Sequence, residues 1–149
     1  MALPILETAT YELTLPSSNV QVKYRPFLVK EEKILLLAME SDNAGEITKA
    51  LKDIVHACTF GSINVDLLPT FDLEYIFLNV RAKSVGEVAK LKLLCPDDKE
   101  TYAQVELDLS KVNVEVDDEH TNEIVVNDKV KIIMKYPTID TVDPKLNVE

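Results

Sequence analysis

Near its start the chain alternates apolar and polar residues on either side of a turn. Every second residue is apolar over residues 11–15, and the alternation resumes over residues 20–24. A period of two is typical of a β-strand, and the intervening Pro16-Ser17-Ser18-Asn19 has the composition of a turn. We therefore predict an N-terminal β-hairpin, whose second strand ends at Pro26 because proline has no N–H to donate.

The next segment, from about residue 29 to residue 40, is predicted to be a helix. Charged residues at positions 30–33 precede an unbroken apolar run over residues 34–38. A strand is the competing interpretation of so short a run, but Leu, Ala, Met, Glu and Lys favour a helix. Because this helix would be apolar on nearly every side, we expect it to be buried on nearly every side.

Two further helices are predicted from the spacing of apolar residues. The first starts after Asn43, which can cap it together with Glu46, and ends before Gly61. Its apolar stripe has helical spacing and consists of Ile47, Ala50, Leu51, Ile54, Val55 and Cys58. The second covers residues 71–83, with Pro69 in its first turn. Its apolar residues cover two adjacent faces, so we expect it to be contacted on more than one side.

Beyond Gly86 the apolar period changes to two. Residues 89–95 and 101–109 alternate on either side of Pro96-Asp97-Asp98-Lys99, which is the strongest hairpin signal in the chain. The alternation continues at residues 112–116, 124–126 and 130–136. We predict an antiparallel sheet of four to five strands with one solvated, acidic face.

These elements predict an α+β fold in a single domain, residues 1–149. A chain of 149 residues can bury about two thirds of the surface that its unfolded form exposes. It divides into a helical half to about residue 86, a β-rich half over residues 87–136, and an extended C-terminal arm over residues 137–149, where prolines interrupt any periodicity.

The net charge of −10 argues against binding to nucleic acid or to an anionic membrane, since both require a basic surface. Residues 91–149 carry fourteen acidic and seven basic side chains, a net charge of −7. This excess is interpreted either as a solvated face or as a surface for a basic partner. No apolar run approaches a membrane span, and no basic residue precedes an apolar core at the N-terminus, so we expect folding in a cytoplasm.

Catalytic and metal-binding motifs are not recognised. In a reducing cytosol, Cys58 and Cys95 are expected to be buried thiols. The dense run Asp117-Asp118-Glu119-His120 is expected to be a solvated loop, because successive loop residues rarely converge on one ion, and His56 is expected at the surface. With three glycines, the chain has no phosphate-binding loop. Acidic residues are too abundant for a catalytic carboxylate pair to be recognised by spacing. We predict no cofactor, no metal and no enzymatic activity.

Two long strings of residues are not explained by the apolar periodicity of a helix or a strand. They read Arg-Pro-Phe-Leu-Val-Lys-Glu-Glu-Lys at residues 25–33 and Phe-Asp-Leu-Glu-Tyr-Ile-Phe-Leu-Asn-Val-Arg-Ala-Lys-Ser-Val-Gly-Glu at residues 71–87. With the sequence around them, they resemble the baseplate hub and hub-assembly proteins of T-even-type contractile-tailed bacteriophages. The resemblance extends over about residues 11–136.

The resemblance implies a non-enzymatic structural subunit of the hub region of a phage tail baseplate. Its partners would be other baseplate or tail proteins, with no nucleic acid, membrane or small-molecule substrate. It would lie in the virion tail baseplate, after assembly in the host cytoplasm. One alternative is a transient hub assembly chaperone that is absent from the mature virion, and a more remote one is a tail-associated cell-wall hydrolase.

Residues within the two strings are candidates for partner binding. Arg25 and Phe27 are of the types enriched in interface hot spots. Arg81 and Lys83 can pair with Asp72 or Glu74 of the same chain, or with carboxylates of a neighbour. The candidate set is Arg25, Phe27, Glu31, Glu32, Phe71, Asp72, Tyr75, Arg81 and Lys83. The alternative is an internal network in which these residues fix the hairpin to the helices.

Overall fold

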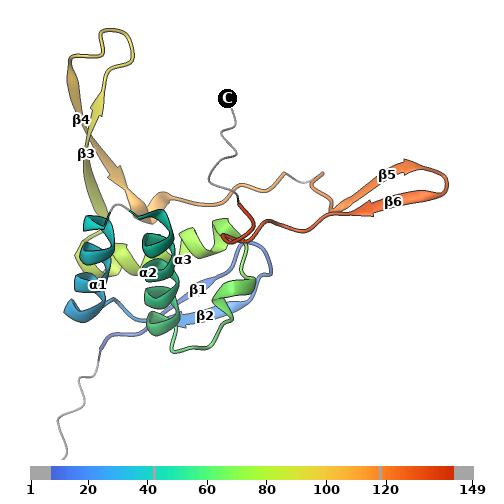
Figure 1. The fold of residues 1–149 in the computed structure, drawn as a ribbon, viewed down its shortest axis with the longest axis horizontal. Coiled ribbons are helices and arrows are strands. Elements are labelled where there is room, and N and C mark those ends of the chain that lie inside the picture. Colours follow the sequence, from blue (N-terminus) through green and yellow to red (C-terminus); the bar gives the residue numbers. More distant parts are fainter. Residues whose placement is uncertain (1–7, 42, 118, 143–149) are drawn as a thin grey trace, which may run out of the picture.

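The computed structural model describes residues 8–41, 43–117 and 119–142. Its helices are α1 (Val29–Glu40), α2 (Ala44–Cys58) and α3 (Thr70–Val85), with short 3-10 turns η1 (Val65–Leu67) and η2 (Leu109–Lys111). Its strands are β1 (Tyr11–Thr14), β2 (Gln21–Tyr24), β3 (Val88–Leu94), β4 (Tyr102–Asp108), β5 (Glu123–Asn127) and β6 (Val130–Ile133). The helices and the hairpin β1–β2 form one body, from which the hairpins β3–β4 and β5–β6 project in different directions (Figure 1).

The α+β class, the N-terminal hairpin and the three helices are confirmed, but the β-rich half does not form the single sheet that we expected. Its strands pair antiparallel as two separate ribbons, β3–β4 and β5–β6. The alternating residues 112–116 form no strand. After β4 the chain turns through η2 and leads away from the ribbon (Figure 1). Alternation is a local property, whereas a strand also needs a neighbouring edge to bond with.

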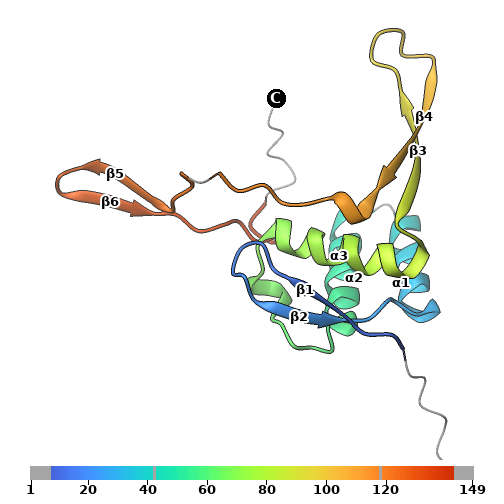
Figure 2. The same cartoon turned by 180° about the vertical axis from the view of Figure 1, so that it is seen from behind.

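The core lies where α2, α3 and the hairpin β1–β2 meet. Ile54 and Val55 of α2 and Leu73, Ile76 and Val80 of α3 are all at most 1% exposed. The hairpin contributes the apolar residues of one face, namely Leu13, Leu15, Val22 and Tyr24. Helix α3 runs across α1 and α2 and beside the hairpin (Figure 2).

A second, smaller cluster on α3 holds the base of the β3–β4 ribbon. Ala82 of α3 is buried with Ala89 and Leu109, and Leu78 packs against them. The N–H of Leu109 donates to the carbonyl of Glu87 at 2.7 Å, which closes the base of the ribbon. The prediction that this helix is contacted on more than one side is therefore confirmed.

Helix α1 is much less buried than we expected. Among its residues only Glu31 and Ala38 are buried, and Leu36 and Leu37 are each 56% exposed. The prediction of all-round burial was wrong because α1 lies at the edge of the body, where it packs against α2 and leaves its outer side uncovered (Figure 1). An apolar run identifies the side chains that a helix could bury, but the position of the helix in the fold determines which of them are buried.

The described part of the predicted C-terminal arm packs on the body. The N–H of Thr70 donates to the carbonyl of Pro137 at 3.1 Å, and Ile139 packs against the core. Residues 138–142 form a turn rather than an extended segment.

Residues 143–149 of the arm lie outside the described residues, as do residues 1–7, to which the expectation about a secretory signal refers. In the described part of the chain, the helices are too short or too polar to cross a membrane.

The two thiols are expected to differ strongly in reactivity. Both are free, Cys58 inside the core and Cys95 half-buried at the end of β3. Burial raises the pKa of Cys58 to about 11, so roughly one thousandth of it is thiolate at pH 8. A maleimide or disulfide reagent should modify Cys95 first and Cys58 more slowly, by roughly a hundredfold or more. In denaturant both should react alike, and equal rates in the native protein would contradict this core.

Candidate interaction surfaces

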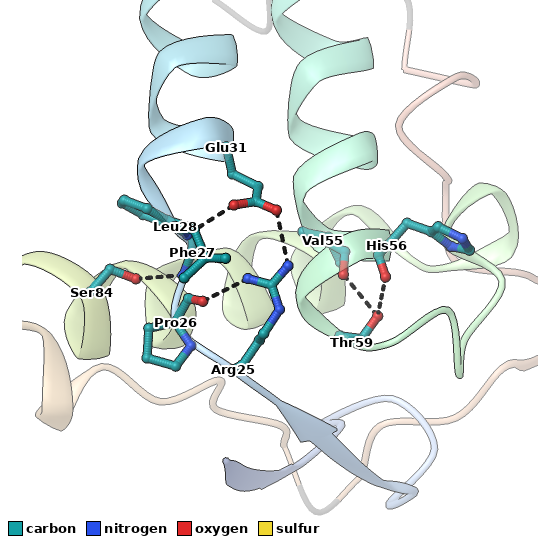
Figure 3. Close-up of polar contacts among 9 residues, drawn as sticks. All are labelled: Arg25, Pro26, Phe27, Leu28, Glu31, Val55, His56, Thr59 and Ser84. Atoms are coloured by element: carbon teal, nitrogen blue, oxygen red, sulfur yellow. Dashed lines mark hydrogen bonds and ion pairs between the residues drawn. The ribbon is translucent and has the colours of Figure 1, made fainter. Parts of the chain in front are cut away.

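Arg25 and Glu31 form a network inside the chain, at the junction between β2 and α1 (Figure 3). Nη2 of Arg25 donates to Oε1 of Glu31 at 2.9 Å, and Nη1 donates to the carbonyl of Pro26 at 2.9 Å. Oε2 of Glu31 accepts from the N–H of Leu28 at 2.9 Å, which caps the first turn of α1. The N–H of Arg25 itself donates to the carbonyl of Cys58 at the end of α2. The ion pair therefore joins the hairpin to α1, and the backbone hydrogen bond of Arg25 adds α2.

The protonation of Glu31 is coupled to this network. Burial by itself raises the pKa of the Glu31 carboxyl, but the hydrogen bonds from Arg25 and from the backbone together outweigh it, so the pKa lies below its ordinary value of 4.5. The ionised form is thus the one that the folded chain favours.

Asp72 anchors the turn of the β1–β2 hairpin to the first turn of α3. Its side chain is fully buried, and its carboxylate accepts from both the N–H and the hydroxyl of Ser17. A carboxylate in the first turn of a helix is also favoured by the helix dipole. Asp72 therefore pairs with neither Arg81 nor Lys83, and Lys83 instead pairs with Glu87 and lies 5.4 Å above the ring of Tyr11.

Phe27, Glu32 and Arg81 line an open groove of about 520 Å³ between the three helices. The N–H of Phe27 donates to Oγ of Ser84 at 2.9 Å, which fixes the start of α1 to the end of α3 (Figure 3). The other lining residues are apolar, namely Leu35, Leu36, Met39, Ile47, Leu51, Phe77 and Val85. The groove can accept an apolar segment, with Glu32 and Arg81 as its charged contacts.

The two remaining candidates are aromatic and half-buried. Tyr75 packs against the core. The ring of Phe71 meets that of Tyr136 edge-on at 5.0 Å, and Tyr136 stacks on His120, whose Nε2 lies 2.7 Å from the Tyr136 hydroxyl. These contacts tie the base of the β5–β6 ribbon to the start of α3. Arg25, Glu31 and Asp72 are thus engaged within the chain, whereas Glu32, Arg81 and Lys83 reach the surface.

The β3–β4 ribbon has one apolar face that is exposed over most of its length. The register pairs Leu91 with Val105 and Leu93 with Ala103 on this face. Leu91, Leu93, Val105 and Leu107 are 39–50% exposed. On the opposite face Lys90 pairs with Glu106 at 3.4 Å. An isolated two-stranded hairpin is marginally stable in water, so this apolar face is suited to be covered by another protein.

The β5–β6 ribbon is similar. Ile124 pairs with Ile132, and both are nearly half exposed, as is Val130. The alternation in the sequence revealed these residues as strand residues, but we expected them to lie within a larger sheet. The alternation in the sequence indicates a strand with one apolar face, and such a face has to be buried against something. It does not indicate whether the same chain buries this face, and the described residues leave it exposed.

The described residues bring together few groups for metal or acid–base chemistry. Sγ of Cys95 and carboxylate oxygens of Asp97 and Asp98 lie within 4.8 Å of one another at the tip of β3–β4. Hydrogen bonds from the hydroxyl and N–H of Thr101 and from Glu100 lower the pKa of Asp98 and explain its position as part of the turn. In the predicted loop around His120, Asp118 lies outside the described residues.

A polar groove of about 690 Å³ lies on the other side of α2, between that helix and η1. Lys52 bridges two carboxylates there, Asp66 at 2.9 Å and Asp140. Hydrogen bonds to Asp140 and Asp66 raise the pKa of Lys52. The ion pairs hold η1 and the C-terminal turn against α2, so this groove has a structural explanation. His56, which lines it, is exposed, as expected.

The described chain is thus an α+β protein with a closed core and uncovered apolar surfaces, a combination typical of proteins that assemble with others. Comparison with models of protein families matches residues 8–148 to the family described as T4 bacteriophage base plate protein. Comparisons with curated proteins and with solved structures gave no match. The chain belongs to the T4 bacteriophage base plate protein family, and the resemblance noted in the sequence is confirmed at this level.

Replacement of Glu31 by Gln tests the network at the start of α1. Because the folded-state pKa of Glu31 is lowered, its ionised form adds stability above pH 4.5 that is lost as the pH falls through the folded-state value. We expect the variant to be about 2 kcal/mol less stable than the parent at pH 7, and this difference to shrink as the pH falls towards 3. Urea unfolding at several pH values measures it. The exposed Glu32→Gln is the control, and a difference independent of pH would refute the assignment.

Replacement of Asp72 by Asn tests the anchor between hairpin and helix. Both the N–H and the hydroxyl of Ser17 donate to the carboxylate. An amide keeps only one accepting oxygen and carries no charge, so both charge-assisted bonds are lost and the Ser17 hydroxyl has to turn and accept from the new NH₂. We expect the free energy of unfolding to fall by about 2 kcal/mol. Glu74→Gln, at an exposed position of the same helix, should change it little. Equal stabilities of the two variants, measured by thermal unfolding, would show that the anchor is not needed.

Proposed function

We propose that this protein is a non-enzymatic structural subunit of the hub region of a phage tail baseplate. It acts by binding other baseplate or tail proteins, first in the host cytoplasm during assembly and then in the virion. Membership in the base plate family supports the setting. The hub assignment rests on the resemblance of residues 25–41 and 68–87 to hub and hub-assembly proteins.

The observation that carries the proposal is the apolar face of the β3–β4 ribbon. Its leucines and Val105 are exposed in the single chain because the ribbon projects away from the core that could cover them (Figure 1). Burial of such surface contributes about 25 cal/mol for each Å², which would favour a lasting contact over solvent exposure. A ribbon with open edges also offers strand pairing to a neighbouring chain. Both properties suit a protein whose packing is completed by assembly.

The groove between the helices supplies a second contact in this proposal. Phe27, Glu32 and Arg81 belong to the strings on which the resemblance rests, and all three line this groove. An apolar segment of a baseplate partner that carries an acidic residue would pair with Arg81 while covering Phe27. Phe71, Tyr75 and Lys83 remain proposed contacts at the edges of the body.

Quantitative mass spectrometry of purified virions and of assembly intermediates tests the proposal. We expect the protein in virions at a fixed ratio to other baseplate proteins. Presence in intermediates alone would instead identify a transient assembly chaperone, and absence from both would overturn the phage-tail role. A cell-wall hydrolysis assay should remain at background, and clear activity would favour a tail-associated hydrolase.

A pair of variants on adjacent residues tests the ribbon. Val105→Glu places a charge on the apolar face, whereas Gln104→Glu places the same side chain on the polar face of the same strand, opposite Lys92. We expect the first to reduce incorporation into virions about tenfold, as loss of one central apolar contact can do, and the second to leave it nearly unchanged. Mass spectrometry of virions assembled with each variant measures this. Equal incorporation would exclude the apolar face as a contact.

A further inference from the structure

On the outer side of α1, the described residues leave a short stripe uncovered, one edge of which, Leu36, also lines the groove between the helices. At 100° per residue, five residues fall within an arc of about 100° on the side away from the body. These residues are Val29, Lys33, Leu36, Leu37 and Glu40. All are exposed, with Val29 at 79% and the two leucines at 56%. The buried residues Glu31 and Ala38 lie on the opposite side of the helix, towards α2 and the hairpin junction.

The charges of this stripe are arranged symmetrically about its centre. Lys33 lies three residues before Leu36, and Glu40 lies three residues after Leu37. Within the part of the chain that the structure describes, neither Lys33 nor Glu40 takes part in an ion pair. The stripe thus has an apolar centre with a positive end and a negative end at equal distances from it.

This charge pattern is complementary to the same pattern on a second copy of α1 that runs antiparallel to the first. A two-fold axis between Leu36 and Leu37 would place the α1 helices of two copies antiparallel. Leu36 of each copy would then face Leu37 of the other, and Lys33 would face Glu40 twice. An isologous contact of this kind requires that the same patch serve both partners. A partner of unrelated sequence would have no reason to match this symmetry.

We propose that the outer stripe of α1 binds the α1 helix of a second copy of this chain. The paired helices α1 and α2 of each copy would then form a four-helix arrangement, the usual way for two helical hairpins to cover their apolar sides. Two chains with a net charge of −10 repel each other, but the exposed side chains of α1 sum to zero, with Lys30 and Lys33 against Glu32 and Glu40. The stripe is therefore a face on which two such chains can meet.

The size of the contact sets the expected affinity. Helix α1 has 12 residues, so it is about 18 Å long. A contact along one helix of this length is smaller than the roughly 800 Å² per partner of a stable complex, so we expect a weak dimer with a dissociation constant in the micromolar range. The inference concerns the isolated protein and does not depend on its proposed place in the baseplate.

Charge exchange on the full chain tests the inference. Sedimentation velocity over a concentration series should show a monomer–dimer equilibrium for the parent. Lys33→Glu would set two carboxylates against each other twice, and Glu40→Lys would do the same with two ammonium groups. Each single variant should weaken the dimer about tenfold or more. The double variant Lys33→Glu/Glu40→Lys restores opposite charges and should return the dissociation constant to that of the parent.

Lys92→Glu is the matched control, since it makes the same change of charge at an exposed side chain of β3 whose partner across the ribbon is the neutral Gln104. It should dimerise like the parent. All positions are exposed, so circular dichroism and thermal unfolding should be unchanged in every variant. The inference is overturned if the parent is monomeric at the highest concentration, if the single variants dimerise as the parent does, or if the double variant stays as weak as the single ones.

Discussion

Helix α3 buries Leu73, Ile76 and Val80 against α2 and the hairpin β1–β2, and it also holds the base of the β3–β4 ribbon, while α1 packs mainly against α2. Its two ends are fixed by polar contacts. At the start, Asp72 accepts from Ser17 in the hairpin turn, and at the end, Ser84 accepts from the N–H of Phe27 where α1 begins. Apolar burial thus supplies most of the stabilisation, while a few partly buried hydrogen bonds set the angles at which hairpin and helices meet.

The charged residues in the two strings have divided roles. Glu31 and Glu32 are neighbours, yet one is buried in an ion pair with Arg25 and the other lines an open groove. Successive residues on a helix point about 100° apart, so of two adjacent glutamates one can face the interior and the other the surface. The internal network that the sequence offered as an alternative accounts for Arg25, Glu31 and Asp72. It leaves the groove residues free for a partner.

The molecule combines a closed core with apolar surfaces that the described part of the chain does not cover. The body is small, and most apolar residues of the two ribbons and of the outer side of α1 stay exposed, whereas Leu35 and Ala38 of α1 face inward. In a protein that works alone, such surface would favour aggregation. In a member of a base plate family it suits a subunit that completes its packing against neighbours. The excess of acidic side chains opposes non-specific association of single chains.

The sequence by itself determined three helices and the two hairpins β1–β2 and β3–β4, with boundaries close to those predicted, because period and turn residues act locally. It also marked the segments that form β5 and β6 by their alternation, though not as a hairpin of their own. It also identified Asn43, whose side chain caps α2 by accepting from Gly45. It did not decide that residues 89–133 form two ribbons instead of one sheet, that α1 lies at an edge, or that Asp72 meets Ser17. Those outcomes depend on which surfaces of the folded chain meet across long sequence separations, and a periodic pattern states only that a face is apolar, not what will cover it.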